Sequence, residues 1–255
     1  MKILVCDGDS WTSGDIINPE INTTHVNSKE NDSYRLPKVW PYKLGTLLNV
    51  KTKNYAIAGS SNDGIVRRTI ENIIGLLYQY NSDDIFVIIG WSSPERKDFY
   101  YKGDRNCWET LYPAQLNQDL PKDLNQFYKT YLRYFWNEEE YLNRYVHQNI
   151  YLHNFLKNKK IKHLFFDAFY EGKVHGIKQN FELHQKIGEN KQTNIVEEYL
   201  QIRDNCFINK SFRKVIMEKK EKLFDGIHPN EIGHEVWSKY IKNFYVEKRW
   251  SFKND

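Results

Sequence analysis

The chain has 255 residues, 40% of them hydrophobic and 27% charged, which suits one well-buried globular domain. Its 37 basic and 33 acidic residues leave a net charge of +4, too small and too dispersed to indicate nucleic acid as a partner. No apolar run approaches the roughly 18 residues of a membrane span, and the first predicted strand leaves no room for a signal peptide before it. We therefore expect a cytoplasmic protein with neither a nucleic-acid nor a membrane partner.

The predicted elements alternate between strands and helices along the chain. Apolar runs predict strands at 2–6, 53–58, 84–89 and 161–166. Helical spacing of apolar residues predicts helices at 39–48, 65–80 and 230–246, and one long or two consecutive helices over 124–159. Residues 15–38 lack an apolar period and are expected to be a long loop, and 171–222 are polar and weakly periodic.

Strands separated by helices predict parallel βαβ units, and hence an α/β fold with a doubly wound parallel sheet. We expect a single domain over 1–255, with helical insertions within about 95–222, because no linker or internal repeat divides the chain. Ligands of such sheets bind beyond the carboxyl ends of the strands. Ser10, Gly59 and Ser92 each follow a predicted strand, so we expect the functional site at that edge.

A serine, a histidine and an aspartate at opposite ends of the chain have the composition of a catalytic triad. Ser10 follows the first strand in Gly8-Asp9-Ser10, and Asp225 and His228 lie three residues apart in Asp225-Gly226-Ile227-His228-Pro229-Asn230. A serine needs a base to take its proton, and the base works best when a third group orients it. The alternative for each motif alone is a turn or a helix cap. Together they predict a serine hydrolase.

Four ordered motifs resemble those of the SGNH/GDSL-type hydrolases, a flavodoxin-like α/β family that includes lipases, esterases and carbohydrate O-acetylesterases. They are Gly8-Asp9-Ser10, Asn54-Tyr55-Ala56-Ile57-Ala58-Gly59, Ile88-Ile89-Gly90-Trp91-Ser92 and Asp225-Gly226-Ile227-His228-Pro229-Asn230. The segment 90–96 is also similar to divergent members associated with tailed bacteriophages, which would allow a virion-associated location.

The resemblance assigns a role to several residues. It implies Ser10 as nucleophile, His228 as general base and Asp225 as the residue that orients the base. Ser10 and Gly59 would hold the oxyanion through backbone N–H groups, with Ser92 as a third donor. Weaker candidates for substrate binding are Asp9, Asn62 and Trp91. The family needs no cofactor, and the other histidines lack the spacing of a zinc site, so no metal is expected.

One position departs from the family pattern. Ser92 stands where the family has an asparagine that donates to the oxyanion, and loss of one such donor typically lowers kcat by about 10²–10³-fold. Ser92 or Ser93 could replace it, Asn62 could reach in from the neighbouring loop, the enzyme could be slow, or the protein could bind without catalysis.

Three functions remain open from the sequence. The leading hypothesis is an esterase that removes a short acyl group, such as acetyl, from a carbohydrate. The second is a non-catalytic glycan- or ligand-binding protein, and the third is an acyltransferase that uses the same triad. Aromatic residues of the 95–222 region could line a sugar-binding cleft or fill a core. They are Tyr100, Tyr101, Trp108, Tyr112 and the series Tyr128, Tyr131, Tyr134, Phe135 and Trp136.

Overall fold

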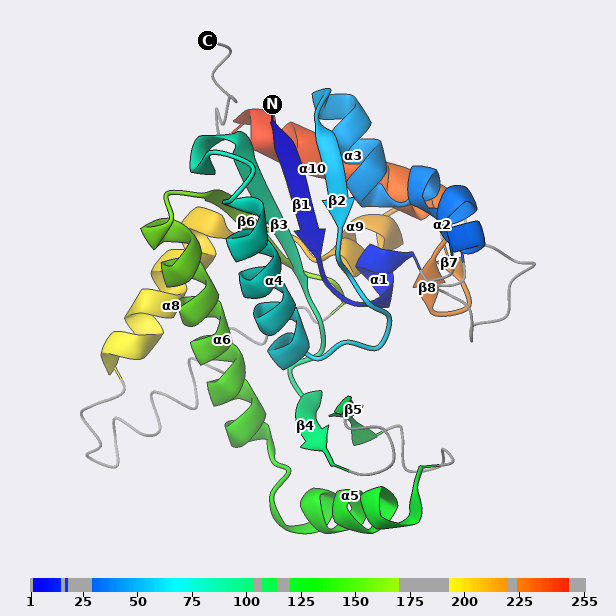
Figure 1. Cartoon of the computed structure of the whole chain (residues 1–255), viewed down its shortest axis with the longest axis vertical. Helices are drawn as coiled ribbons and strands as arrows, with labels where there is room; N and C mark the ends of the chain where they lie inside the picture. The colour runs from blue at the N-terminus through cyan, green and yellow to red at the C-terminus, as the bar shows by residue number, and fades with distance from the viewer. Residues whose placement is uncertain are drawn as a thin grey trace.

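A computed structural model describes residues 2–14, 17, 29–102, 107–113, 120–169, 193–219 and 224–247. Four parallel strands form its centre in the order β2-β1-β3-β6 (Figure 1). They are β1 (Ile3–Asp7), β2 (Lys51–Asn54), β3 (Ile85–Trp91) and β6 (Lys162–Asp167). Every residue of β1 and β3 is buried, as expected of central strands that are covered on both faces.

Helices cover both faces of this sheet (Figure 1). On one face lie α4 (Asn62–Leu76), α6 (Glu138–Asn158) and α8 (Thr193–Cys206). On the other lie α3 (Trp40–Leu48), α9 (Phe212–Met217) and α10 (Glu231–Glu247). Side chains alternate along a strand, so Ile3 and Val5 join the first core cluster while Leu4 and Cys6 join the second. The predicted α/β class and doubly wound parallel sheet are confirmed.

Several short elements lie between the main strands and helices along the chain. They are α1 (Ser10–Ser13), α2 (Lys29–Arg35), the 3₁₀ turns η2 (Leu36–Lys38) and η3 (Ser82–Asp84), and the strands β7 (Phe224–Asp225) and β8 (His228–Pro229). β7 and β8 form a small antiparallel pair, in which Asp225 is the partner of His228. No helix in the described part of the chain is long and apolar enough to cross a membrane.

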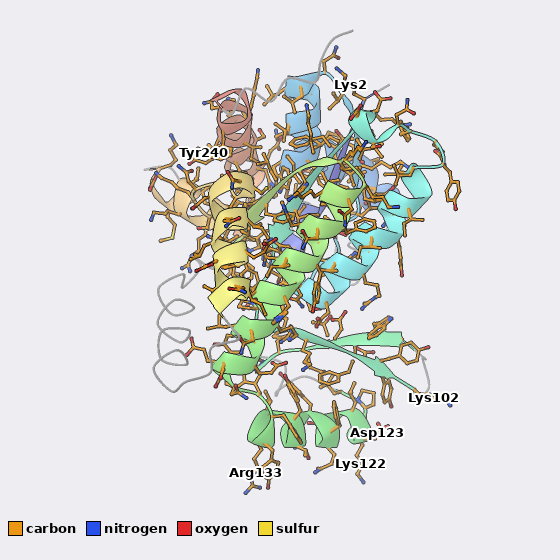
Figure 2. The ribbon with its side chains drawn as sticks, turned by 90° about the vertical axis from the view of Figure 1, so that its left-hand side faces the viewer. Lys2, Lys102, Lys122, Asp123, Arg133 and Tyr240 are labelled. Carbon is orange, nitrogen blue, oxygen red and sulfur yellow. The ribbon has the colours of Figure 1, made fainter. Side chains whose placement is uncertain are left out.

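Within the region 95–222, a hairpin and a helix project beyond the main sheet. The antiparallel strands β4 (Lys97–Tyr101) and β5 (Cys107–Leu111) lie alongside α5 (Lys122–Tyr134), at the opposite end of the molecule from Lys2 (Figure 2). Leu111, Leu124, Tyr128 and Tyr131 form a separate hydrophobic cluster between them. Tyr128 and Tyr131 therefore fill a core, whereas Tyr134 and Phe135 are exposed.

The predicted strand at 53–58 is wrong over most of its length, because β2 spans Lys51–Asn54. β2 is an edge strand with three lysine or asparagine residues, so it carries no apolar pattern to mark its start. Its end is set by Asn54, whose side chain accepts a hydrogen bond from the Ala56 backbone N–H and turns the chain.

The two polar regions contain helices that the sequence analysis did not predict. Within 15–38, residues 29–35 form α2. Its buried Arg35 guanidinium donates to the Ser13 carbonyl, a tertiary contact, and to Asp32 within the same helix. Within 171–222, α8 buries apolar residues three or four positions apart, a period that the polar residues between them obscure. These are Val196, Tyr199, Ile202 and Cys206.

The helical region predicted at 124–159 is two helices. Asn137 separates them, and its side chain accepts a hydrogen bond from the Glu140 N–H at 2.8 Å, which caps the start of α6.

Candidate active site

Ser10 lies at the carboxyl end of β1, as the sequence predicts, and it is the first residue of α1. Asp9 is the residue that caps this helix, since its side chain accepts from the Trp11 N–H at 3.0 Å. The alternative in which Ser10 only caps a helix is therefore wrong. The Ser10 Oγ lies 3.0 Å from Nε2 of His228, which β8 supplies from the other end of the chain.

Two glycines allow α1 to approach the sheet closely. A Cβ atom on Gly8 would lie 2.4 Å from the Thr12 Oγ1, and one on Gly90 of β3 would lie 2.7 Å from the same oxygen. Neither contact is compatible with a side chain, so the glycines before Ser10 and Ser92 permit the packing that places the serine over the strand ends.

Asp225 stands opposite His228 in the β7–β8 pair, but its side chain is exposed. Among the residues that the structure describes, its carboxylate makes no hydrogen bond to His228. Residues directly opposite in an antiparallel pair have Cβ atoms about 4.5–5.5 Å apart, so the two side chains start from neighbouring positions. Its role as third member of a triad stays a prediction.

Ser92 follows β3 and is buried, and both of its hydroxyl contacts are to other side chains. The hydroxyl lies 2.9 Å from the Asp9 Oδ2 and 2.9 Å from the Arg96 Nη1. Arginine can only donate, so Ser92 accepts from Arg96 and directs its single hydrogen to Asp9. In this arrangement Ser92 does not present a donor to an oxyanion.

Asn62 and Trp91 do not contact the space beside Ser10. The side chain of Asn62 binds the backbone of Ser92 in both directions, at 2.8 Å from its N–H and 3.1 Å from its carbonyl. Trp91 is fully buried against Tyr145 and Phe165. The predicted contact of Trp91 with substrate is wrong, because its side chain points from β3 into the core. Asn62 holds the backbone of Ser92 through these two hydrogen bonds.

The contacts of Asp9 are likewise with other groups of the protein. It is fully buried between the Trp11 N–H, the Ser92 hydroxyl and Arg96, whose Nη1 lies 3.5 Å from its Oδ2. Burial raises its pKa, and the positive charge of Arg96 opposes that shift. The prediction that Asp9 touches substrate directly finds no support in this geometry.

Gly59 lies in the turn after β2 and has φ of 77°, a conformation that favours glycine. A Cβ there would meet nothing within 4 Å, so the backbone conformation alone accounts for the glycine. The role of its backbone N–H as an oxyanion donor stays a prediction.

A pocket of about 440 Å³ opens beside Ser10 and His228. Its walls are aromatic, aliphatic and basic. Besides the serine and histidine they comprise Trp11, Arg96, Phe169, Arg213, Met217, Phe224, Gly226 and Ile227. The aromatic residues that the sequence analysis considered for sugar binding do not line it.

Arg96 and Arg213 are the charged residues of this pocket that sequence reasoning missed. Arg96 lies four residues after Ser92, the residue that follows β3, and its proximity to that motif was a signal available in the sequence. Arg213 comes from α9, in a region without a clear predicted element, so only the fold brings it to the pocket.

The fold and these contacts define an α/β protein with a serine–histidine pair at the carboxyl edge of a parallel sheet. The chain belongs to a family of unknown function, DUF6071, which matches residues 23–253. The matched range includes His228 and begins after Ser10. No curated protein matches the sequence.

Solved structures that resemble the chain are remote in sequence. A putative lipolytic protein of the G-D-S-L family from Desulfitobacterium hafniense is 14% identical, with a TM-score of 0.46 over 95% of this chain and 99% of that one. A catalytic mutant of Axe2, an acetylxylan esterase from Geobacillus stearothermophilus, is 13% identical, with a TM-score of 0.48 over 98% and 95%. The psychrotrophic esterase EstA from Pseudoalteromonas is 12% identical, with a TM-score of 0.45 over 96% and 100%. At this distance, the function has to be argued from the site itself.

Proposed function

We propose that the protein is a serine esterase that hydrolyses a short-chain ester through an acyl-enzyme. The observation that carries this proposal is the 3.0 Å separation between the Ser10 Oγ and the His228 Nε2, in a pocket open to a small ligand. This is the contact that a nucleophile and its base require. The bacteriophage resemblance of segment 90–96 finds no support in the comparisons and plays no part in the proposal.

The reaction follows from the positions of these two side chains. Ser10 Oγ attacks the ester carbonyl while His228 Nε2 takes its proton, and the protonated imidazole then gives that proton to the leaving alcohol. Water repeats the sequence on the acyl-enzyme and releases the acid. Asp225 accepts from the Nδ1–H of His228 after its side chain turns toward the ring, and so stabilises the imidazolium.

Arg96 supplies the positive charge that stabilises the oxyanion alongside backbone N–H groups of Ser10 and Gly59. It lines the pocket with Ser10, whereas the hydroxyl of Ser92 is directed to Asp9. The contacts of Arg96 with Ser92, Asp9 and the Ser60 carbonyl hold its guanidinium in place before substrate arrives. Charge that is already oriented costs little reorganisation in the transition state.

The pocket favours a short acyl group on an alcohol that carries a negative charge. Arg96 and Arg213 line it and no aspartate or glutamate does so in the described part of the chain. Trp11, Phe169 and Phe224 provide apolar walls for a methyl group or the face of a sugar ring. An O-acetylated acidic sugar combines these features.

The first experiment measures release of p-nitrophenol from the acetate and butyrate esters by wild type, Ser10→Ala and His228→Ala, with folding checked by circular dichroism. We expect turnover by wild type that falls by at least about 10³-fold in both folded variants. Acetylated acidic and neutral sugars, compared next, should differ in KM, and the difference should shrink in Arg213→Gln.

Two other outcomes would change the assignment. A folded wild type without turnover, whose glycan binding survives Ser10→Ala, would indicate a binding protein. Acylated product that appears only when an acceptor sugar is added would indicate acyl transfer in place of hydrolysis.

A further inference from the structure

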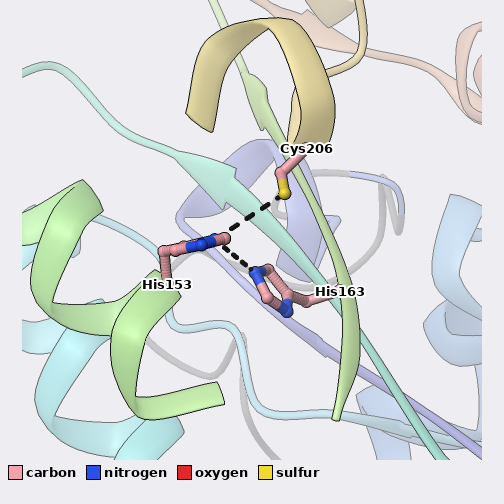
Figure 3. Close-up of side chains that lie close together, drawn as sticks. All are labelled: His153, His163 and Cys206. Atoms are coloured by element: carbon pink, nitrogen blue, oxygen red, sulfur yellow. Dashed lines mark hydrogen bonds between the residues drawn. The ribbon is translucent and has the colours of Figure 1, made fainter. Parts of the chain in front are cut away.

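Three metal-ligand side chains meet on the face of the sheet away from the Ser10 pocket. They are His153 on α6, His163 on β6 and Cys206 at the end of α8 (Figure 3). One ligand atom from each lies within 4.8 Å of the others. His163 and Cys206 are buried and His153 is partly buried, so the cluster is enclosed. Phe165 and Cys206 belong to the core cluster under α4, α6 and α8, whereas Trp11 at the pocket belongs to the opposite one.

The hydrogen bonds around the two imidazoles direct ring nitrogens toward one another. His163 Nδ1 lies 2.9 Å from the Ile161 carbonyl oxygen, so it carries a hydrogen and leaves the lone pair on Nε2. That Nε2 lies 2.9 Å from the His153 Nδ1, which also lies 3.6 Å from the Cys206 Sγ. A backbone carbonyl that fixes the tautomer of a histidine in this way is the usual outer partner of a metal ligand.

Two of the three separations between the ligand atoms can be compared with those of a tetrahedral zinc site, and the third is within 4.8 Å. Zn–N distances of about 2.0–2.1 Å and a Zn–S distance of about 2.3 Å imply about 3.4 Å between two nitrogens and about 3.6 Å between nitrogen and sulfur. The observed 3.6 Å between His153 and Cys206 agrees with this, and the 2.9 Å between the histidines requires a small opening. Burial lowers the pKa of His163 to about 4 and also lowers that of His153, so both rings are neutral at pH 7, as ligands must be.

We propose that His153, His163 and Cys206 bind one Zn²⁺ ion that ties α6, β6 and α8 together. The three protein ligands leave the fourth position of the ion to water. On binding, the Cys206 thiol loses its proton to solvent and the Zn–S bond forms, so each zinc ion releases one proton from this residue. The three ligands come from separate elements, 10 and 43 residues apart in sequence, which is why no local zinc spacing is present.

The test uses the full chain without a histidine tag, stripped of metal with a chelator and returned to one equivalent of Zn²⁺ or Co²⁺. We expect one zinc per chain by mass spectrometry of the desalted protein, and a higher melting temperature with zinc than without it. The cobalt form should show the strong visible absorption of a tetrahedral ion and a thiolate-to-cobalt charge-transfer band in the near ultraviolet. This spectrum is measured on wild-type protein, so the result does not depend on whether any variant folds.

Variants then assign the ligands. Cys206→Ser should abolish the charge-transfer band, and Cys206→Ser and His163→Gln should each weaken zinc binding by at least about 100-fold, beyond the 10–100-fold typical of outer partners. The matched controls Cys107→Ser and His147→Gln change the same residue types elsewhere, in β5 and on α6, and should bind zinc as wild type does. A folded wild type that takes up no zinc, or a charge-transfer band that survives Cys206→Ser, would overturn the proposal and leave a hydrogen-bonded histidine pair.

Discussion

At the residue scale, the site depends on the direction of one hydroxyl hydrogen. A serine hydroxyl could in principle donate to an oxyanion, and the sequence alone does not say where its hydrogen points. The structure places Asp9 at 2.9 Å on one side of Ser92 and Arg96 at 2.9 Å on the other. The Ser92 hydroxyl is therefore occupied by these two contacts, and Arg96 is the group that we propose stabilises the oxyanion.

We predict that Arg96→Gln lowers kcat on p-nitrophenyl acetate by about 10²-fold or more with little change in KM, because the interaction that it removes strengthens only in the transition state. The measurement is steady-state kinetics on protein whose folding is verified by circular dichroism.

The control for this prediction is Arg67→Gln. Arg67 also pairs with a buried aspartate, Asp98, at 2.8 Å, but it does not line the pocket. Its kcat should stay within about twofold of wild type, as is usual for a change outside the reacting groups. A rise in KM at constant kcat in Arg96→Gln would instead make Arg96 a substrate-binding residue.

At the scale of elements, two glycines in neighbouring elements have opposite surroundings. Gly90 lies in the central strand β3, where an added Cβ would approach Phe166 and Thr12 to 2.7 Å. Gly75 lies in α4, where an added Cβ would meet nothing within 4 Å. The same chemical change therefore tests packing at one site and helix propensity at the other.

We predict that Gly90→Ala lowers the free energy of unfolding by about 1–3 kcal/mol through overpacking. Gly75→Ala should raise it by about 0.5–1 kcal/mol, since alanine loses less backbone entropy in a helix. Urea unfolding of both variants beside wild type measures the two values. Equal effects of both substitutions would show that the close approach of α1 to β3 does not constrain the residue at position 90.

At the scale of the whole molecule, contacts between distant parts of the chain assemble both the core and the site. His228 reaches Ser10 across 218 positions, and His234 of α10 accepts a hydrogen bond from the Trp40 N–H of α3 at 3.2 Å. Burial, with smaller contributions from the charges of Lys43 and His228, lowers the pKa of His234 to about 3. The C-terminal helix is thereby linked to the start of α3 by a histidine that must stay neutral.

This histidine makes stability depend on pH. The unfolded chain binds a proton at His234 below about pH 6.5 and the folded chain does not, so its stabilising contribution is complete above that pH and is lost as the pH falls toward 3. We predict that wild type loses about 2–3 kcal/mol more than His234→Asn between pH 7 and 4.5, at about 1.4 kcal/mol per pH unit. Asparagine keeps an acceptor near the Nδ1 position and does not titrate.

Urea unfolding at a series of pH values measures this difference. A constant offset between the two proteins across the range would contradict it, because that result would mean that His234 titrates alike in the folded and unfolded chains.

The sequence by itself determined the central strands, most of the helices around them and the edge at which a site would lie. Buried strands such as β3 are continuous apolar runs, and helices such as α10 repeat apolar residues at helical spacing, so local pattern suffices for them. It also singled out Ser10 and His228, because each stands beside a glycine-containing turn at the end or start of an element.

Only the tertiary structure decided the elements and contacts that have no local pattern. β2 is polar because it lies at the edge of the sheet, and α2 is held by the contacts of one buried arginine. The placement of Arg96 in the pocket, the burial of Trp91 and the meeting of His153 with Cys206 depend on how separate elements pack. Because such contacts join residues far apart in sequence, the spacing of side chains along the chain does not predict them.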